Sequence, residues 1–353
     1  MNRRRFLIQT SSGFAATLAR RTPSRAQATG DRAAQIAGLM KELHDQRMFT
    51  GAILVADKGN VIYAGGFGLA DRNAGRPYTP ETRSCLASVS KPITALAVMM
   101  LVEKRELKYE QTLGRFYPIF TEAVGAVTVR QLLTHTSGIP DYPDLKADHP
   151  GVTNAEILAA VRKVQAPAFA PGQKYQYCNG GYVLLALIVE KISGLALPRF
   201  LDERILGPAG MTSTFVLTSA SQKTADVARG YDESGKADDF EGMSTGDGGV
   251  YSTVKDLLRF DQALYTDALV KQSSLDEAFT PASVREGQTT YGLGWNINDD
   301  VPGKRVWHQG NTAGFRAFIE RRLRDRITVI MLTNGGNTNR MAINDRIQKI
   351  LAG

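Results

Sequence analysis

The chain has 353 residues, 43% hydrophobic and 22% charged, which is enough for one large globular domain or two moderate ones. Its formal net charge is +8, but six arginines and no acidic residue lie within the first 28 residues. Without that segment, 37 basic residues stand against 35 acidic ones, a balance of +2. The remainder has no basic stripe and no nucleic-acid motif, which argues against a nucleic-acid partner.

The N-terminal segment has the pattern of an export signal. Residues 2–8, NRRRFLI, resemble a twin-arginine signal, and the weakly apolar stretch 6–19 is too short and polar to span a bilayer. Residues 26–28, Ala-Gln-Ala, fit a cleavage site. We therefore expect residues 1–28 to be a signal peptide and the mature protein, from Thr29, to be periplasmic or secreted with no stable membrane anchor. A basic tail without export function is the alternative interpretation.

The segments that follow predict a mixed α/β chain. Apolar residues recur at helical spacing within residues 31–48. Two apolar runs, at 51–57 and 60–71, predict strands joined by a hairpin turn at Lys58-Gly59-Asn60. A largely apolar helix is then expected from about Ser88 to Lys104.

Four more helices are predicted in the middle of the chain, at 128–138, 153–164, 180–194 and 253–265. Thr128 with Gln131, and Thr253 with Asp256, match the capping box at a helix start. Strand-like runs return at 291–298, 304–310, 314–323 and 326–334, and a final helix is predicted at 340–351. This order predicts an α/β (α+β) fold: an antiparallel sheet from both chain ends, flanked by helices, with a helical insertion subdomain.

Ser88 and Lys91 form the first candidate catalytic pair. Positions three apart on a helix lie one turn apart on one face, and helical side chains lean toward the N-terminus, so Lys91 leans over Ser88. A neutral amine there can take the serine proton, and the apolar helix disfavours the charged form. Ser-x-x-Lys also occurs by chance. A second copy, Ser252 to Lys255, precedes a polar-faced helix and is better explained by capping.

Two further motifs lie downstream. Tyr177 and Asn179 precede an apolar helix, where the structural alternative is an N-cap for Asn179 and a packed ring for Tyr177. His308 is expected at the end of a strand, and Gly310 lets the backbone approach a ligand closely. Taken alone, such a histidine is usually a satisfied polar residue.

Together and in this order, the motifs resemble those of the serine β-lactamase and penicillin-binding-protein family, in its class C β-lactamase-like, esterase and D-peptidase branch. Residues 88–91 match Ser-x-x-Lys, 177–179 match Tyr-x-Asn, and 308–310 match the His-x-Gly variant of the Lys-Thr/Ser-Gly motif. The resemblance covers about residues 33–350. Cys178 departs from the serine or alanine common inside Tyr-x-Asn, and there is no Lys-Thr-Gly.

The resemblance implies a β-lactamase/DD-peptidase-like fold and an acyl-enzyme mechanism. Ser88 would be the nucleophile, and Lys91 and Tyr177 would share proton transfer, either one being the base. Asn179 would orient the lysine and the substrate. The backbone N–H groups of Ser88 and Asn311 would form the oxyanion hole.

The resemblance also assigns substrate-binding positions. His308 would bind a substrate carboxylate or support Tyr177, and Gly310 completes its motif. Arg316, just past the strand turn, can supply a positive charge that His308 lacks. His135, although part of the family pattern, is expected to be structural because no spacing connects it to Ser88.

A serine hydrolase acting on esters, small D-amino-acid peptides or β-lactam-like amides is therefore predicted. The alternatives are a penicillin-recognising protein that acylates without turnover and a true β-lactamase. We expect one catalytic domain over 29–353, with its sheet part at about 29–115 and 240–353 and its helical part at about 116–239. No cofactor or metal is expected, and the small-molecule substrate is the expected partner, with the oligomeric state open. Cys85 and Cys178 are expected to be reduced, because twin-arginine substrates fold before export.

Overall fold

The computed structural model describes residues 25–352 except 220, 221, 223, 225, 239–242, 285–289, 300–302, 336 and 337. Most of the predicted signal peptide, residues 1–24, lies outside the described residues. The predicted cleavage site at 26–28 lies inside the first helix, α1 (Arg25–Asp45).

The centre of the fold is an eight-stranded antiparallel sheet with the order β2-β1-β13-β12-β11-β10-β9-β8. It joins the two ends of the chain, because β1 (Gly51–Asp57) pairs with β13 (Ile327–Thr333) in the register Gly51↔Thr333 to Asp57↔Ile327. The predicted sheet built from both chain ends is thus confirmed. The other strands are β2 (Asn60–Phe67), β8 (Ser283–Val284), β9 (Thr290–Tyr291), β10 (Asn296–Asn298), β11 (Arg305–Thr312) and β12 (Phe315–Arg322).

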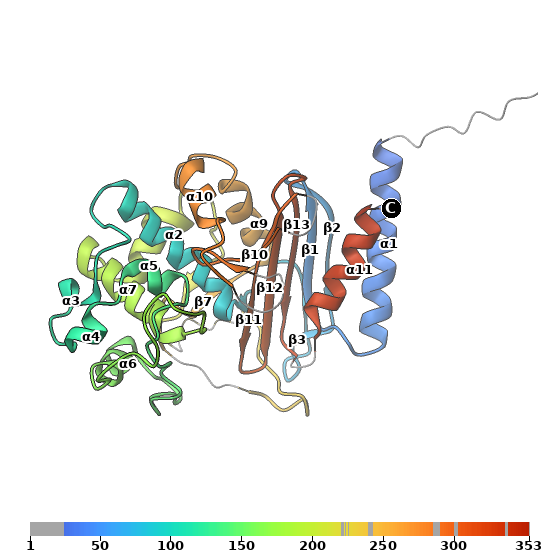
Figure 1. The fold of residues 1–353 in the computed structure, drawn as a ribbon. Coiled ribbons are helices and arrows are strands. Elements are labelled where there is room, and N and C mark those ends of the chain that lie inside the picture. The colour runs from blue at the N-terminus through green and yellow to red at the C-terminus, as the bar shows by residue number, and fades with distance from the viewer. Residues whose placement is uncertain are drawn as a thin grey trace, which may run out of the picture.

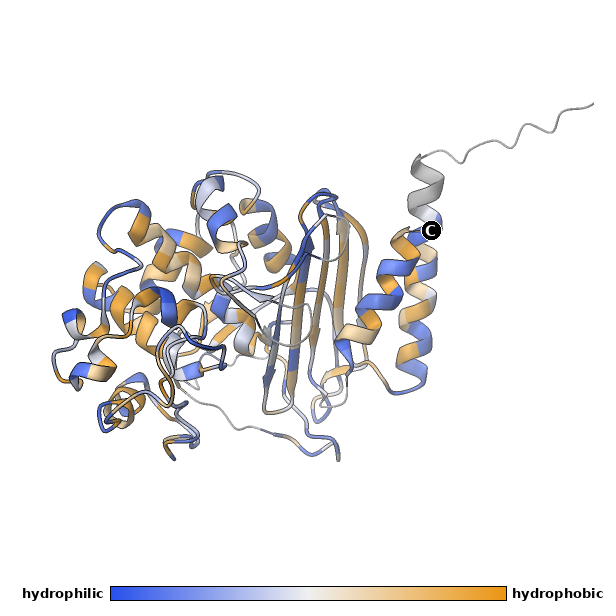
Figure 2. Ribbon diagram, viewed as in Figure 1, coloured by the Kyte–Doolittle hydropathy of each residue, from blue (hydrophilic) through white to orange (hydrophobic). Residues whose placement is uncertain are grey.

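Helices cover both faces of this sheet (Figure 1). The central strands β1 and β13 are almost entirely buried, which explains why their sequences are continuous apolar runs rather than alternating ones. On one face, α1 lies beside α11 (Arg340–Ala352), and the core there includes Ile36, Met40, Val329 and Ile347. Figure 2 shows hydrophobic and hydrophilic residues interleaved along both helices, as expected for helices with one buried face.

The opposite face of the sheet supports the helical part of the molecule. There α2 (Ser90–Glu103) packs against α7 (Asn179–Ser193), and α9 (Val254–Ala263) contacts β13. One continuous hydrophobic core runs from Leu54 of β1 to Ile188 of α7, so the predicted sheet and helical parts share a core. The remaining helical elements are α3 (Leu113–Phe116), α4 (Glu122–Gly125), α5 (Val129–Leu133), α6 (Asn154–Val161), α8 (Leu197–Leu201), the π-helical turn η2 (Asp202–Leu206) and α10 (Gln272–Ala278).

The hydrophobic length of the described helices bears on membrane insertion. Among them, no single helix is both long and apolar enough to cross a membrane. Only α7 together with Leu197–Leu206, a pair bent by 75°, meets that length and composition.

Two predicted strands are interrupted by glycines. The run 60–71 ends as β2 at Phe67, because Gly68 has a φ of 72° and turns the chain. The residues after it form β3 (Leu69–Asp71), which pairs with β4 (Arg76–Pro77) in a separate sheet. The run 291–298 is likewise split into β9 and β10, with Gly294 at a φ of 84° between them.

The predicted helix starts are partly confirmed. Thr128 and Gln131 form a capping box at the start of α5. At α9, Thr253 caps the helix by accepting from the Asp256 backbone N–H, but the second predicted box is wrong. The Asp256 carboxylate instead accepts from the Ser213 backbone and the Thr214 hydroxyl, at 2.7 and 2.9 Å. The Asp256 carboxylate therefore binds a loop about 40 positions earlier in the chain, and a local sequence pattern does not predict that contact.

Glu320 of β12 is a buried carboxylate between the sheet and α11. It accepts hydrogen bonds from Asn344 at 2.9 Å and Gln348 at 2.8 Å, and Arg305 lies 3.5 Å away. Burial raises the pKa of Glu320 to about 7. Because the folded-state pKa exceeds the unfolded value, protonated Glu320 favours the folded state at low pH, and this contribution is lost as pH rises through about 7.

We therefore expect the free energy of unfolding of the parent to fall with pH relative to that of Glu320→Gln. The difference should be on the order of 2 kcal/mol between about pH 5 and pH 8, measured by urea unfolding. Glu42→Gln is the matched control, because Glu42 of α1 also pairs with a residue of α11, Arg346, but is about half exposed. If the free energy of unfolding changed with pH in the same way in the parent and in Glu320→Gln, the raised pKa of Glu320 would be contradicted.

Candidate active site

Ser88 lies on a turn rather than on the long helix. Residues Ala87–Val89 form a 3-10 turn, η1, and α2 begins at Ser90, two residues later than predicted. Ala87 has a φ of 45°, a backbone conformation that residues other than glycine rarely adopt. The turn is held from the side by β5 (Ser84–Cys85), which pairs with β7 (Val250–Ser252) in a small sheet completed by β6 (Phe215–Val216). A strained turn thus presents the half-buried Ser88 at the start of a buried helix.

Lys91 lies beneath Ser88 and has no exposed surface. Its Nζ is 3.0 Å from Ser88 Oγ, 2.8 Å from Asn179 Oδ1 and 2.9 Å from the backbone carbonyl of Asp247. Three oxygen atoms therefore surround the amine at hydrogen-bond distance and fix its position. The predicted proximity of Ser88 and Lys91 is therefore present in the structure.

Asn179 is oriented by a carboxylate that the sequence did not single out. Its Nδ2 donates to Asp141 Oδ2 at 2.8 Å, and Asp141 Oδ1 also accepts from the Gly180 backbone at 2.8 Å. This leaves Asn179 Oδ1 directed at Lys91. Cys178, not Asn179, caps α7, and its Sγ accepts from the Gly181 backbone at 3.3 Å. The N-cap interpretation of Asn179 is thus wrong, and its side chain serves the lysine instead.

Tyr177 packs between Lys91 and His135. The centre of its half-buried ring is 4.8 Å from Lys91 Nζ and 4.2 Å from the centre of the His135 ring. His135 is fully buried, its Nδ1 accepts from the Cys178 backbone at 3.1 Å, and its carbonyl accepts from Gln176 at 2.8 Å. These contacts hold the segment that carries Tyr177, which fits the structural role expected for His135.

His308 lies in the middle of β11 rather than at its end. Only 2% of the residue is exposed, Nε2 is 3.0 Å from Tyr291 Oη, and Nδ1 is 2.9 Å from the Gln309 carbonyl. Burial raises the pKa of Tyr291 and of neighbouring Tyr182 well above the usual value, so both phenols stay protonated. His308 faces this tyrosine pair in the structure, and its contact with substrate stays a prediction.

Gly310 brings β11 against the turn that carries Ser88. A Cβ at this position would lie 2.1 Å from the Leu86 carbonyl oxygen and 3.0 Å from the Ala87 Cβ. The close approach is therefore to the chain's own backbone, two residues before the nucleophile, rather than to a ligand as expected. It sets the distance between Ser88 and the neighbouring Asn311.

Two arginines hold the end of the β11–β12 hairpin. Arg340, which the sequence analysis missed, donates from Nη1 to the Gly310 carbonyl and from Nη2 to Asn311 Oδ1, both at 2.6 Å. Arg316 donates from Nη1 to the carbonyls of Thr312 and Phe315, at 2.7 and 2.8 Å. Burial lowers the pKa of Arg340 to about 10, and the Arg316 charge adds to this effect. In this structure both guanidinium groups stabilise backbone near the site.

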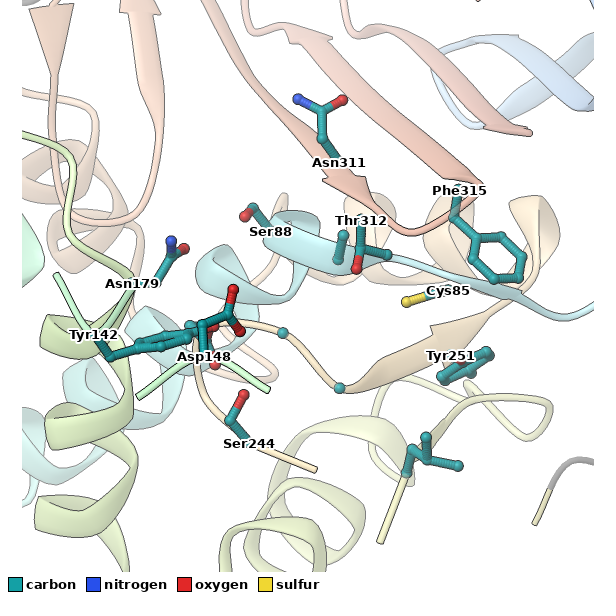
Figure 3. Close-up of a pocket in the computed structure, with 15 residues that line it drawn as sticks. Cys85, Ser88, Tyr142, Asp148, Asn179, Ser244, Tyr251, Asn311, Thr312 and Phe315 are labelled. Atoms are coloured by element: carbon teal, nitrogen blue, oxygen red, sulfur yellow. The ribbon is translucent and has the colours of Figure 1, made fainter. Parts of the chain in front are cut away.

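A cleft opens in front of Ser88 (Figure 3). In this view Ser88 lies between Asn179 on one side and Asn311 with Thr312 on the other, and Tyr142, Asp148 and Ser244 form a further wall. The cleft is lined by Cys85, Ala87, Ser88, Tyr142, Asp148, Asn179, Leu217, Ser244, Asp247, Gly248, Gly249, Tyr251, Asn311, Thr312 and Phe315. The structure thus brings Ser88, Asn179 and Asn311 to one cleft. The other predicted site residues are not part of this lining: Lys91, Tyr177, His308, Gly310 and Arg316.

Both cysteines are near the site, as the resemblance implied. Cys85 lines the cleft and Cys178 caps α7; both are buried, and neither forms a disulfide within the described part of the chain. Burial raises the pKa of the Cys178 thiol, which disfavours a reactive thiolate.

Comparison with known proteins agrees with this geometry. The chain belongs to the β-lactamase family, whose sequence model matches residues 33–353. It is 35% identical to penicillin-binding protein 4* of Bacillus subtilis strain 168 over 320 residues, covering 84% of this chain and 70% of that protein. A D-aminopeptidase of Cereibacter sphaeroides is 29% identical, covering 79% of this chain but only 55% of that protein.

Solved structures give the same assignment. The octameric penicillin-binding protein homologue from Pyrococcus abyssi superposes with a TM-score of 0.84 at 30% identity, covering 91% of this chain and 77% of that one. The predicted β-lactamase-like fold is confirmed. The protein is a serine hydrolase of the β-lactamase and penicillin-binding-protein type.

Proposed function

We propose that this protein is an exported hydrolase that forms an acyl-enzyme on Ser88 and turns over esters or small D-amino-acid peptides better than β-lactams. The observation that carries the proposal is the position of Lys91 Nζ, within hydrogen-bond distance of Ser88 Oγ, Asn179 Oδ1 and the Asp247 carbonyl. A buried lysine held against a serine in an open cleft is an activated-nucleophile arrangement.

In the proposed reaction, Ser88 Oγ attacks the substrate carbonyl carbon while its proton passes to the Lys91–Tyr177 pair. The tetrahedral oxyanion is stabilised by the backbone N–H groups of Ser88 and Asn311, and its collapse expels the leaving group with a proton. Water then attacks the acyl-enzyme through the same oxyanion position, and Ser88 is regenerated. Asn179 keeps Lys91 in place throughout, because Asp141 fixes its amide.

The preference against β-lactams follows from charge. A β-lactam carries a carboxylate, which a strand lysine would bind through a charge-assisted hydrogen bond. Here that position is His308, which is buried against Tyr291. The guanidinium groups of Arg316 and Arg340 donate hydrogen bonds to backbone carbonyls of the β11–β12 hairpin. None of the residues that line the described cleft is a lysine or an arginine.

We expect kcat/KM for a nitrophenyl ester to exceed that for a chromogenic cephalosporin by roughly tenfold or more. Tenfold is about the loss in rate expected when one charge-assisted hydrogen bond to the cephalosporin carboxylate is missing. Both substrates are to be assayed with the same protein preparation, and the Ser88→Ala rate is subtracted. Faster turnover of the cephalosporin would point to a true β-lactamase.

The alternative function is a penicillin-recognising protein that acylates once. The name of the 35% identical Bacillus protein supports considering it. The time course with the nitrophenyl ester separates the two: sustained release identifies an enzyme, whereas a burst of one equivalent per chain identifies a binder. A D-amino-acid substrate is suggested by the D-aminopeptidase relatives, of which this chain spans about half.

We propose export by the twin-arginine pathway on the sequence of residues 2–8. The test is cell fractionation with N-terminal sequencing of the periplasmic or secreted form, which should begin at or near Thr29. Replacing Arg3 and Arg4 with lysine should retain the full-length protein inside the cell. An unprocessed protein inside cells that carry the natural sequence would contradict the proposal.

A further inference from the structure

Asp247 is a buried carboxylate on the wall of the Ser88 cleft. Only 6% of the residue is exposed, and it lines the cleft beside Ser244 and Gly248. Its backbone carbonyl accepts from Lys91, and its Oδ2 accepts from the Tyr142 hydroxyl at 3.2 Å. The contact with Lys91 thus fixes the Asp247 backbone beside the nucleophile, and the contact with Tyr142 holds one carboxylate oxygen.

The second oxygen of this carboxylate has no hydrogen-bond partner among the described residues. Within the described part of the chain, Asp247 Oδ1 is buried and has no partner at hydrogen-bond distance. Burial raises the pKa of Asp247 and the Asp141 charge adds to the rise, whereas the Lys91 charge and the side chains of Tyr142 and Ser244 oppose it. Leaving a buried acceptor unsatisfied is costly, so such an atom beside a cleft is an acceptor for a donor brought by a ligand.

The surroundings of this oxygen carry negative charge. Asp148 is exposed on the same wall, next to the Tyr142 ring (Figure 3). The cleft lining described above has two carboxylates and no cationic side chain, and Asp141 lies behind Asn179. Lys91 is the nearest cation, and three acceptors already surround its Nζ. Such a cleft attracts a cationic group and repels a carboxylate.

We propose that the Ser88 cleft selects acyl donors that carry a protonated amine, and that Asp247 Oδ1 is the acceptor for this ammonium group. The inference rests on the proposed function and narrows its substrate class to aminoacyl esters and amides. The ammonium group donates to Oδ1 while Tyr142 holds Oδ2, and Asp148 adds attraction at the rim. An N-acetylated substrate keeps only a neutral amide N–H donor, and an N-succinylated one carries a negative charge in place of the positive one.

The test is competition against Ser88-dependent hydrolysis of nitrophenyl acetate. The inhibitors are D-alaninamide, N-acetyl-D-alaninamide and N-succinyl-D-alaninamide, compared at about pH 6.5, where an α-amino group is charged. We expect the inhibition constant of D-alaninamide to be roughly tenfold lower than that of the acetyl compound, and the succinyl compound to bind weakest. In Asp247→Asn the ratio of the first two constants should fall to within about threefold.

Two controls keep the outcomes separate. Asp144→Asn, on an exposed position outside the cleft lining, should keep the parent ratio. Asp148→Asn should reduce the ratio less than Asp247→Asn, and it provides a second readout if Asp247→Asn fails to fold. Equal constants, or no inhibition by any of the three compounds in the parent, would overturn the inference while leaving Ser88 catalysis intact. Hydrolysis that survives in Ser88→Ala would instead overturn the proposed function.

Discussion

Ser88→Ala is expected to abolish acyl-enzyme formation and to lower nitrophenyl ester turnover by roughly three orders of magnitude or more. Ser88 Oγ lies in the cleft and is the hydroxyl nearest to a buried amine, at 3.0 Å from Lys91 Nζ. Alanine fills nearly the same space, so the fold should be retained. Intact-protein mass spectrometry after brief exposure to the ester should show an added acyl group in the parent and none in the variant.

Lys91→Ala should lose nearly as much activity, for two reasons. The amine that takes the serine proton is removed, and Asn179 Oδ1 and the Asp247 carbonyl lose their common donor. Lys255→Ala is the matched control, because Lys255 ends the second Ser-x-x-Lys copy but is about half exposed and pairs with Glu81 at the surface. Full ester turnover by purified Ser88→Ala would contradict the assignment of Ser88 as the nucleophile. Equal losses of activity in Lys91→Ala and Lys255→Ala would contradict the catalytic role of Lys91.

The parts of the site that could be predicted from the sequence are those encoded by short spacing. Ser88 and Lys91 are three residues apart at a helix start, so local geometry alone brings them together. The central strands of the sheet could likewise be predicted, because β1 and β13 are continuous apolar runs buried on both faces. Their pairing was predicted from the order of the elements, with strands at both chain ends and helices between them.

The parts that could not be predicted depend on contacts between distant segments. Asp141 meets Asn179 across 38 positions, and the Asp247 carbonyl meets Lys91 across 156. Arg340 reaches Asn311 from the start of α11, where the sequence shows only an ordinary helix residue. No periodicity or spacing rule identifies such partners, because loops and helix ends are brought together only by the packed fold.

The sequence identified the motif that contains Gly310, but it did not reveal why a glycine is required there. A glycine near a site suggests space for a ligand. In the structure that space is filled by the Leu86 carbonyl. The glycine is therefore required by the packing of β11 on the nucleophile turn, and substitution of Gly310 tests this interpretation directly.

Gly310→Ala is expected to lower kcat/KM for the ester by roughly a hundredfold, because a shift of about 1 Å between catalytic groups has that effect. The added methyl group would lie 2.1 Å from the Leu86 carbonyl oxygen, and neither atom belongs to a flexible side chain that could turn away. The strand or the turn must move, which separates Asn311 from Ser88. The overpacking should also cost about 1–3 kcal/mol of unfolding free energy.

Gly38→Ala is the matched control for this substitution. Gly38 lies on an exposed position of α1, and a Cβ there would meet nothing within 4 Å. Alanine at that position should leave kcat/KM unchanged and stabilise the protein by about 0.5–1 kcal/mol, since glycine disfavours helix. Measuring kcat/KM and urea unfolding for both variants separates loss of catalytic geometry from loss of stability. If Gly310→Ala retains the parent kcat/KM, the distance between β11 and the Ser88 turn does not control the reaction.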